Sequence, residues 1–126
     1  MREEISNWLR QSEEDLDKAR ILFENKKFDG VAFNCHQSVE KSLKALYMLK
    51  FNQGEKGHSI IHLASKLSVP QEMLSRVRDL NPEYLVSRYP DIAGGVPADN
   101  YDEEIAMRHF KVAKEVLEWV KKQMQK

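Results

Sequence analysis

Residues 33–46, which read FNCHQSVEKSLKAL, decide the fold. At 100° per residue their apolar side chains fall on one face, and that face continues in both directions along the chain. Its core positions are Phe28, Val31, Ala32, Cys35, Val39, Ser42, Leu43, Leu46 and Leu49. The polar run 52–54 ends the pattern. The sequence therefore predicts a long helix, the longest apolar one of the chain, with one face in the core.

The start of this helix is predicted from its capping residues. Asp29 is expected to be the N-cap, with Phe28 and Phe33 packed against each other across it. Before it, an amphipathic pattern predicts a first long helix over residues 2–25. Its inward face consists of Ile5, Trp8, Leu9, Ser12, Leu16, Ala19 and Phe23.

Short helices are expected after the central one. Ser59 is a predicted N-cap for a short helix that ends near Leu67, and Pro70 suits the first turn of another that runs to Leu80. Asn81-Pro82 predicts one more brief turn. Residues 88–100 are predicted to be an irregular loop, neither helix nor strand, because they hold two prolines and two adjacent glycines.

A last long helix is predicted from Asp102, as its N-cap, to Met124. Its apolar arc is wide, because Val112, Val116 and Trp119 add a second stripe beside the first. No alternating β-branched run occurs, so no strand is expected. The predicted fold class is all-α, an antiparallel up-and-down bundle of three long and one or two short helices, in a single domain over 1–126.

Composition excludes several classes of protein. The chain has 126 residues and is 41% hydrophobic, which is enough for one core, and it has no apolar run long enough to span a membrane and no signal peptide. We therefore expect a cytoplasmic protein. A lone Cys35, expected in the core, forms no internal disulfide. His58 and His62 are four residues apart but lack a third ligand nearby, so neither a metal site nor a cofactor is expected.

The formal net charge of zero conceals a strong asymmetry. Basic and acidic residues number six and eight over 1–30, five and two over 31–69, three and eight over 70–105, and six and two over 106–126. The zero total argues against bulk nucleic-acid binding. The basic central and last helices could still hold a phosphate or an acidic partner, or be ordinary solvated faces.

Two segments carry the candidate binding residues. On the central helix, Gln37, Lys41 and Lys44 share a polar side. His36 and Glu40 border it, one turn apart, and a hydrogen bond between them would raise the pKa of the imidazole. The other interpretation of His36 is a structural histidine at the border of the core. The second segment is Arg88-Tyr89-Pro90-Asp91, which joins a forked cation to an aromatic ring, a rigid proline and a carboxylate.

Arg88 has two interpretations. It could bind a phosphate or a carboxylate of a ligand, or it could pair with Asp91 or with a helix end and so fix the loop.

Together these stretches resemble the HEPN domain family over nearly the whole chain. The residues that carry the resemblance are Trp8-Leu9 to Ala19, residues 33–46, His58 with Leu63, residues 88–91, Tyr101, and Ala113 to Val120. The resemblance implies a helical bundle, commonly a homodimer, often made beside a minimal nucleotidyltransferase as a two-component, toxin-antitoxin-like pair. Many members of the wider family are ribonuclease toxins with an Arg-x4–6-His motif. No arginine of this chain is followed by a histidine at that distance.

Three hypotheses follow. The first is a non-catalytic nucleotide-binding module that partners a nucleotidyltransferase, with Arg88, Lys41 and Lys44 on the phosphates. The residues expected to line that site are His36, Gln37, Glu40 and Asp91. The second is a metal-independent ribonuclease toxin with an atypical site that uses His36 or His58 with Arg88. The third is a pure dimeric assembly protein whose interface consists of Val112, Val116 and Trp119.

Overall fold

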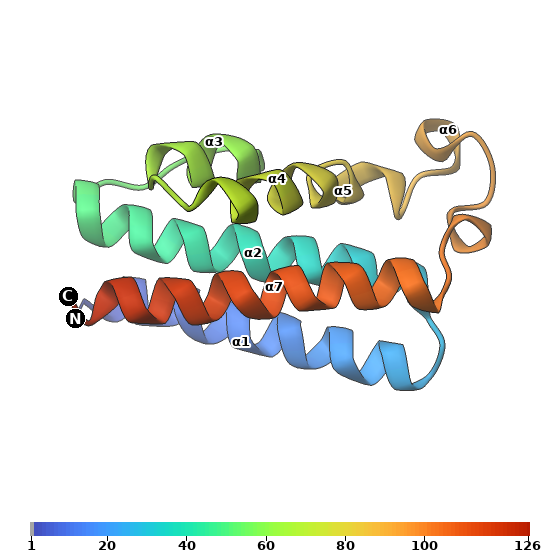
Figure 1. Cartoon of the computed structure of the whole chain (residues 1–126), viewed down its shortest axis with the longest axis horizontal. Coiled ribbons are helices and arrows are strands. Elements are labelled where there is room, and N and C mark those ends of the chain that lie inside the picture. Colours follow the sequence, from blue (N-terminus) through green and yellow to red (C-terminus); the bar gives the residue numbers. More distant parts are fainter. Residues whose placement is uncertain (1) are drawn as a thin grey trace.

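The computed structural model describes residues 2–126 and is a bundle in which four segments alternate in direction (Figure 1). Helix α1 is followed by the reversed α2, then by a return segment broken into three short helices, and finally by the reversed α7. Their bounds are α1 Glu3–Glu24, α2 Phe28–Phe51, α3 Ile60–Lys66, α4 Gln71–Leu80, α5 Glu83–Val86 and α7 Glu103–Met124. The predicted all-α antiparallel bundle is confirmed, and within the described residues there is no strand.

Helix α2 lies at the centre of the bundle. Helices α1 and α7 pack against it, and the short helices α3 and α5 cover it from above in Figure 1. Its residues from Ser42 to Met48 are all buried, so this part of the helix has no solvent face. Cys35, two turns earlier on the same helix, is fully buried as predicted, and burial raises the pKa of its thiol. The helix ends at Asn52, which adopts the left-handed conformation with φ 54°.

Capping predictions are confirmed at two helices and wrong at one. The side chain of Ser59 accepts a hydrogen bond from the amide of His62, and Asp102 accepts one from that of Ile105. At α2, however, the N-cap is Lys27, so Asp29 lies inside the first turn. The predicted packing of Phe28 across that cap is replaced by an edge contact with Phe23, whose ring centroid is 5.7 Å away.

The segment predicted to be irregular contains two short helical turns. Helix α6 spans Pro90–Ala93, and the 3-10 helix η1 spans Pro97–Asn100. Each begins at a proline, whose fixed φ and missing amide suit the first helical position. Gly94 then ends α6 in the left-handed region, at φ 74°. The prolines and glycines that suggested a loop are thus the start and stop signals of single turns.

Both termini lie at the same end of the bundle, opposite the turn that carries α6 (Figure 1). No helix within residues 2–126 is both long and apolar enough to cross a membrane.

Candidate functional site

Arg88 is the centre of the candidate site. It is exposed and lies just after α5, so its guanidinium group folds back over three aromatic rings. The central carbon lies 4.4 Å from the ring centroid of Phe33, 4.7 Å from that of Tyr84 and 4.9 Å from that of Tyr89. Its Nε donates a hydrogen bond of 2.8 Å to the carbonyl of Tyr84. Within the described chain no carboxylate pairs with it, so its two terminal nitrogens can still bind an anion.

Tyr84 links Arg88 to two histidines. The ring of His58 stacks on that of Tyr84 with a centroid distance of 4.2 Å and an angle of 17° between the planes. The ring of His36 lies 5.4 Å from it, tilted by 43°. The side chain of His58 is half exposed, whereas that of His36 is fully buried. The arginine and His58 therefore share one aromatic surface that solvent can reach.

Glu40 lies behind these rings as a buried carboxylate. Its Oε2 accepts hydrogen bonds from Lys44 at 2.8 Å and from Nδ1 of His58 at 2.9 Å. Its Oε1 has no hydrogen-bond partner among the described residues. Because Lys44 is itself buried and paired with Glu40, its charge is largely balanced inside the chain. The predicted role of Lys44 as a free phosphate ligand is therefore weakened.

His36 differs from its predicted environment. Its Nδ1 lies 4.0 Å from Oε1 of Glu40, too far for a hydrogen bond, and is 3.4 Å from the side-chain oxygen of Gln37. Burial lowers the pKa of the imidazole, and this effect exceeds the opposing influence of Glu40. The hydrogen bond on which the upward shift depended is absent, and the other interpretation, a structural histidine, fits this ring, which is buried more completely than a border position predicts.

Two predicted site residues are placed elsewhere. The Nζ of Lys41 is engaged at 2.6 Å by Asp15, so its charge joins α2 to α1. Asp91 is exposed at the start of α6 and forms no ion pair with Arg88, so the Arg88–Asp91 form of the predicted clamp is wrong. The other form, a clamp between Arg88 and a helix end, is supported by the hydrogen bond from Arg88 to the carbonyl of Tyr84 in α5. The structure thus groups Arg88 with His58 through Tyr84, and His58 with Lys44 through Glu40, whereas the charge of Lys41 is paired with Asp15.

The predicted interface residues are part of the core. Val112 is 3% exposed and Val116 is fully buried, while Trp119 is half-buried against the same core. Val112 and Val116 cannot meet a second molecule without the bundle opening. The wide apolar arc of the last helix is explained by its position, since α7 contacts α1, α2 and α4.

A second buried polar cluster is centred on Glu83, the first residue of α5. Glu83 accepts hydrogen bonds from the hydroxyl of Tyr101 at 2.7 Å and from Nε2 of His109 at 3.0 Å. Burial and the bond to Glu83 raise the pKa of Tyr101. No sequence pattern indicates this cluster, because its members are 18 and 26 residues apart and each has an ordinary position on its own element.

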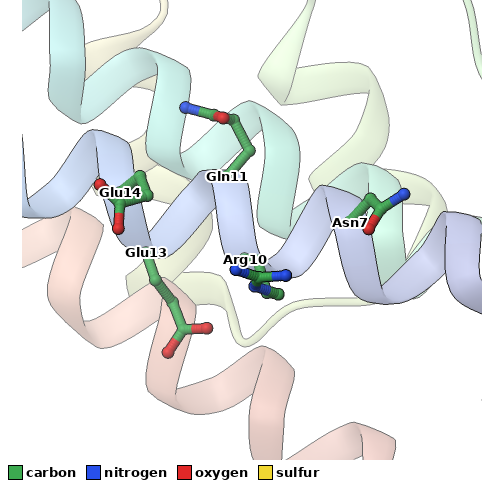
Figure 2. Close-up of a pocket in the computed structure, with 5 residues that line it drawn as sticks. All are labelled: Asn7, Arg10, Gln11, Glu13 and Glu14. Atoms are coloured by element: carbon green, nitrogen blue, oxygen red, sulfur yellow. The ribbon is translucent and has the colours of Figure 1, made fainter.

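The surface also holds a depression of about 470 Å³ on α1, shown in Figure 2. Its lining residues are Asn7, Arg10, Gln11, Glu13 and Glu14. All five are exposed and come from one helix, so no second element closes the depression. It is therefore a weaker candidate than the aromatic surface around Arg88.

Comparisons with known proteins agree on one family. The HEPN domain model matches residues 5–123. A relative from Methanocaldococcus jannaschii, named "Putative toxin MJ1304", is 26% identical over 90% of this chain and 84% of its own. The archaeal HEPN homologue ST0689 has a crystal structure that is 32% identical, with a TM-score of 0.83 over 94% of this chain and 96% of its own. The crystal structure of TT1696 from Thermus thermophilus is 27% identical, with a TM-score of 0.87 over 94% of this chain and 96% of its own.

Proposed function

The chain belongs to the HEPN domain family, and from that premise we propose that it is a non-catalytic nucleotide-binding module that partners a minimal nucleotidyltransferase. One observation carries the nucleotide half of the proposal. The guanidinium group of Arg88 is held against three rings and has no carboxylate partner among the described residues. An oriented arginine fork of this kind suits a phosphate group.

The rings beside Arg88 supply the second element of nucleotide recognition. Tyr89 is 43% exposed and presents an aromatic face next to the cation, whereas the ring of Tyr84 is already occupied by His58 and Arg88. Stacking of a base on such a ring contributes about 1–3 kcal/mol. A nucleotide would place a phosphate on Arg88 and its base on Tyr89.

The non-catalytic role is supported by the sequence and by the charge balance. The Arg-x4–6-His spacing is absent from the chain. The two lysines predicted to contact the phosphates are already paired, Lys41 with Asp15 and Lys44 with Glu40. One unpaired cation binds a phosphate but provides little stabilisation for the extra charge of a transition state.

Calorimetric titration with ATP and with GTP tests the nucleotide half. We expect Arg88→Ala to weaken binding about 10- to 100-fold, since a hydrogen bond to a charged group contributes about 1.5–3 kcal/mol. Arg88→Lys should recover only part of the loss, because lysine lacks the planar fork. Arg78→Ala is the matched control, since Arg78 is an exposed arginine on α4. Equal affinity for the wild type and Arg88→Ala would contradict the proposal.

The partnership needs a separate experiment. Tagged protein isolated from its native host at low salt should carry a nucleotidyltransferase, identified by mass spectrometry. Repeated recovery of the chain without such an enzyme, while nucleotide still binds, would retain the first half of the proposal and overturn the second.

A second candidate function, metal-independent ribonuclease, is supported by the hydrogen bond between His58 and Glu40. This carboxylate accepts from Nδ1 at 2.9 Å, which would direct Nε2 of the half-exposed ring outward as a base. In such a reaction Nε2 takes the proton of a ribose 2′-hydroxyl, the oxygen attacks phosphorus, and the P–O5′ bond breaks to give a 2′,3′-cyclic phosphate. The leaving 5′-oxygen takes a proton from water and becomes a hydroxyl, and the hydroxide that remains accepts the proton held on Nε2. Arg88 would stabilise the charge on the phosphate oxygens.

RNA cleavage in the presence of a chelator distinguishes this candidate. His58→Ala should abolish cleavage, whereas His62→Ala should leave it unchanged. The control is closely matched, because His62 is equally exposed and also contacts a carboxylate, that of Glu55 at 3.2 Å. Absence of cleavage at high protein concentration, or cleavage that survives His58→Ala, would exclude the ribonuclease.

A further inference from the structure

His58 and Arg88 lie against the same aromatic ring, that of Tyr84. The imidazole centroid of His58 is 4.2 Å from the centroid of this ring, and the guanidinium carbon of Arg88 is 4.7 Å from it. The two groups are therefore no further apart than these two distances combined, which is less than the roughly 10 Å over which 0.1 M salt screens charges. An anion at the rim of the Tyr84 ring is within range of both groups.

The hydrogen bond between His58 and Glu40 decides which imidazole nitrogen can donate to a ligand. Nδ1 of His58 lies 2.9 Å from Oε2 of Glu40, and a carboxylate only accepts hydrogen bonds, so Nδ1 carries a proton. In the neutral ring Nε2 is then an acceptor, which repels the oxygens of an anion. Nε2 becomes a donor only when the ring takes up a second proton. Binding of an anion at Nε2 therefore requires the uptake of a proton.

The groups behind His58, on α2, contribute no net charge. Glu40 is paired with Lys44, whose Nζ lies 2.8 Å from Oε2. Burial lowers the pKa of His36, which holds that second imidazole neutral. A proton taken up by His58 thus adds one full positive charge, and the carboxylate of Glu40 stabilises it from the buried side.

The groups on the other elements around His58 leave one cation available. Towards α3, the carboxylate of Glu55 contacts the exposed His62 at 3.2 Å, where solvent screens it. After α5, Arg88 has no carboxylate partner within the described part of the chain. The site therefore offers one positive charge while His58 is neutral and two when it is protonated.

We propose, on the basis of the nucleotide binding proposed above, that this site selects a terminal phosphate, a phosphomonoester, and that protonated His58 binds it together with Arg88. At neutral pH a phosphomonoester carries about two negative charges, since its second pKa is about 6. An internal phosphodiester carries only one. Arg88 and protonated His58 balance the charge of the monoester, whereas Arg88 alone already balances that of the diester.

Proton uptake makes the affinity for a phosphomonoester depend on pH. Histidine is the side chain whose charge changes near neutral pH. As pH rises, the proton needed on Nε2 of His58 is harder to obtain, so the affinity falls by at most about 10-fold per pH unit for one proton. A phosphodiester requires no such proton and should bind equally well across this range. A ring that already holds a proton on Nε2 also cannot act as a base towards a ribose hydroxyl.

Adenosine 5′-monophosphate and cyclic adenosine 3′,5′-monophosphate test the selectivity, because they share base and ribose but contain a phosphomonoester and a phosphodiester. In calorimetric titrations of the full chain at pH 7, we expect the monoester to bind at least about 10-fold more tightly. At pH 8 its affinity should be about 3- to 10-fold lower, with that of the cyclic nucleotide unchanged. Titrations at pH 7 in two buffers of different ionisation enthalpy should show proton uptake with the monoester alone.

His58→Gln assigns the proton to its residue. Glutamine keeps a hydrogen-bond donor for Glu40 but cannot be protonated in this range, so proton uptake and the pH dependence should be lost, and the monoester should bind about 10-fold more weakly. Circular dichroism checks that the variant folds. His62→Gln is the matched control and should behave as the wild type, since the side chains of His62 and His58 are 49% and 51% exposed.

The contrary results separate this proposal from the one on which it rests. Equal affinity of the wild type for the two nucleotides, or proton uptake that survives in His58→Gln, would overturn the selection of a terminal phosphate. In both cases nucleotide binding through Arg88 would stand. If neither nucleotide binds the wild type, the proposed nucleotide binding fails, and the role of His58 fails with it.

Discussion

At His36, burial outweighs the nearest carboxylate in its effect on the pKa of the side chain. Its ring projects from α2, is fully buried and lies 5.4 Å from the ring of Tyr84. Burial lowers the pKa of the imidazole from its usual 6.5, and nearby His58 acts in the same direction. Glu40 and Glu83 oppose the shift without cancelling it. The folded protein therefore holds His36 neutral where the unfolded chain would protonate it.

This shift makes stability depend on pH. As pH falls below about 6.5, the unfolded chain binds a proton at His36 that the folded chain resists, so the free energy of unfolding falls. Above that pH both states are neutral and the stabilisation is complete. Urea unfolding between pH 7.5 and pH 5.5 should show the decrease, at most about 1.4 kcal/mol per pH unit, and His36→Gln should reduce the slope. Equal slopes in the two proteins would contradict this account.

The sequence predicted single residues well where only a local pattern was needed. Cys35 was placed in the core because the helical period alone fixes its face. Glu40 was predicted only as a border residue, although it is 3% exposed, because its coverage depends on His58, 18 residues further along the chain. Glu83, Tyr101 and His109 were missed for the same reason, since their hydrogen bonds exist only after α5 packs beside α7.

At the scale of elements, capping chemistry explains both the successes and the errors. Ser59 and Asp102 have extended backbone conformations just before their helices, and their side chains accept amide hydrogen bonds. Serine and aspartate are both favoured at the N-cap for this reason. At α2 the helix starts earlier in the chain, and Asp29 instead lies near the positive end of the helix. The α6 and η1 turns were missed because proline and glycine give the same signal for a loop and for a single helical turn.

Asp102 provides a direct test at this scale. Asp102→Ala removes the acceptor that lies 2.9 Å from the amide of Ile105, so the free energy of unfolding should fall by about 1 kcal/mol. Asp102→Asn keeps an oxygen acceptor in place, so the free energy of unfolding should fall by only a few tenths of a kcal/mol. Chemical denaturation of the two variants beside the wild type measures both values. An asparagine variant as unstable as the alanine variant would show that charge, and not capping, is what matters.

For the whole molecule, the order of helices was predictable because each long amphipathic segment needs a neighbour and short connections force the next segment to reverse. The charge asymmetry was also visible in the sequence. The positions of the acidic and basic segments relative to each other could not be predicted, because only the structure shows which helices lie side by side. The acidic first helix proves to border the basic last one, and Lys121 of α7 pairs with Glu13 of α1.

The buried thiol of Cys35 provides a natural probe of how often the core of the bundle opens. Burial both covers the sulfur and raises its pKa, so a thiol reagent can react only in the moments when α2 is uncovered. With this sole cysteine, the rate of labelling under native conditions measures how often the centre of the bundle opens, with no engineered probe. A ligand or partner that binds only the closed form will lower the rate of labelling. At equal free concentrations, the tighter the ligand binds, the larger this decrease will be.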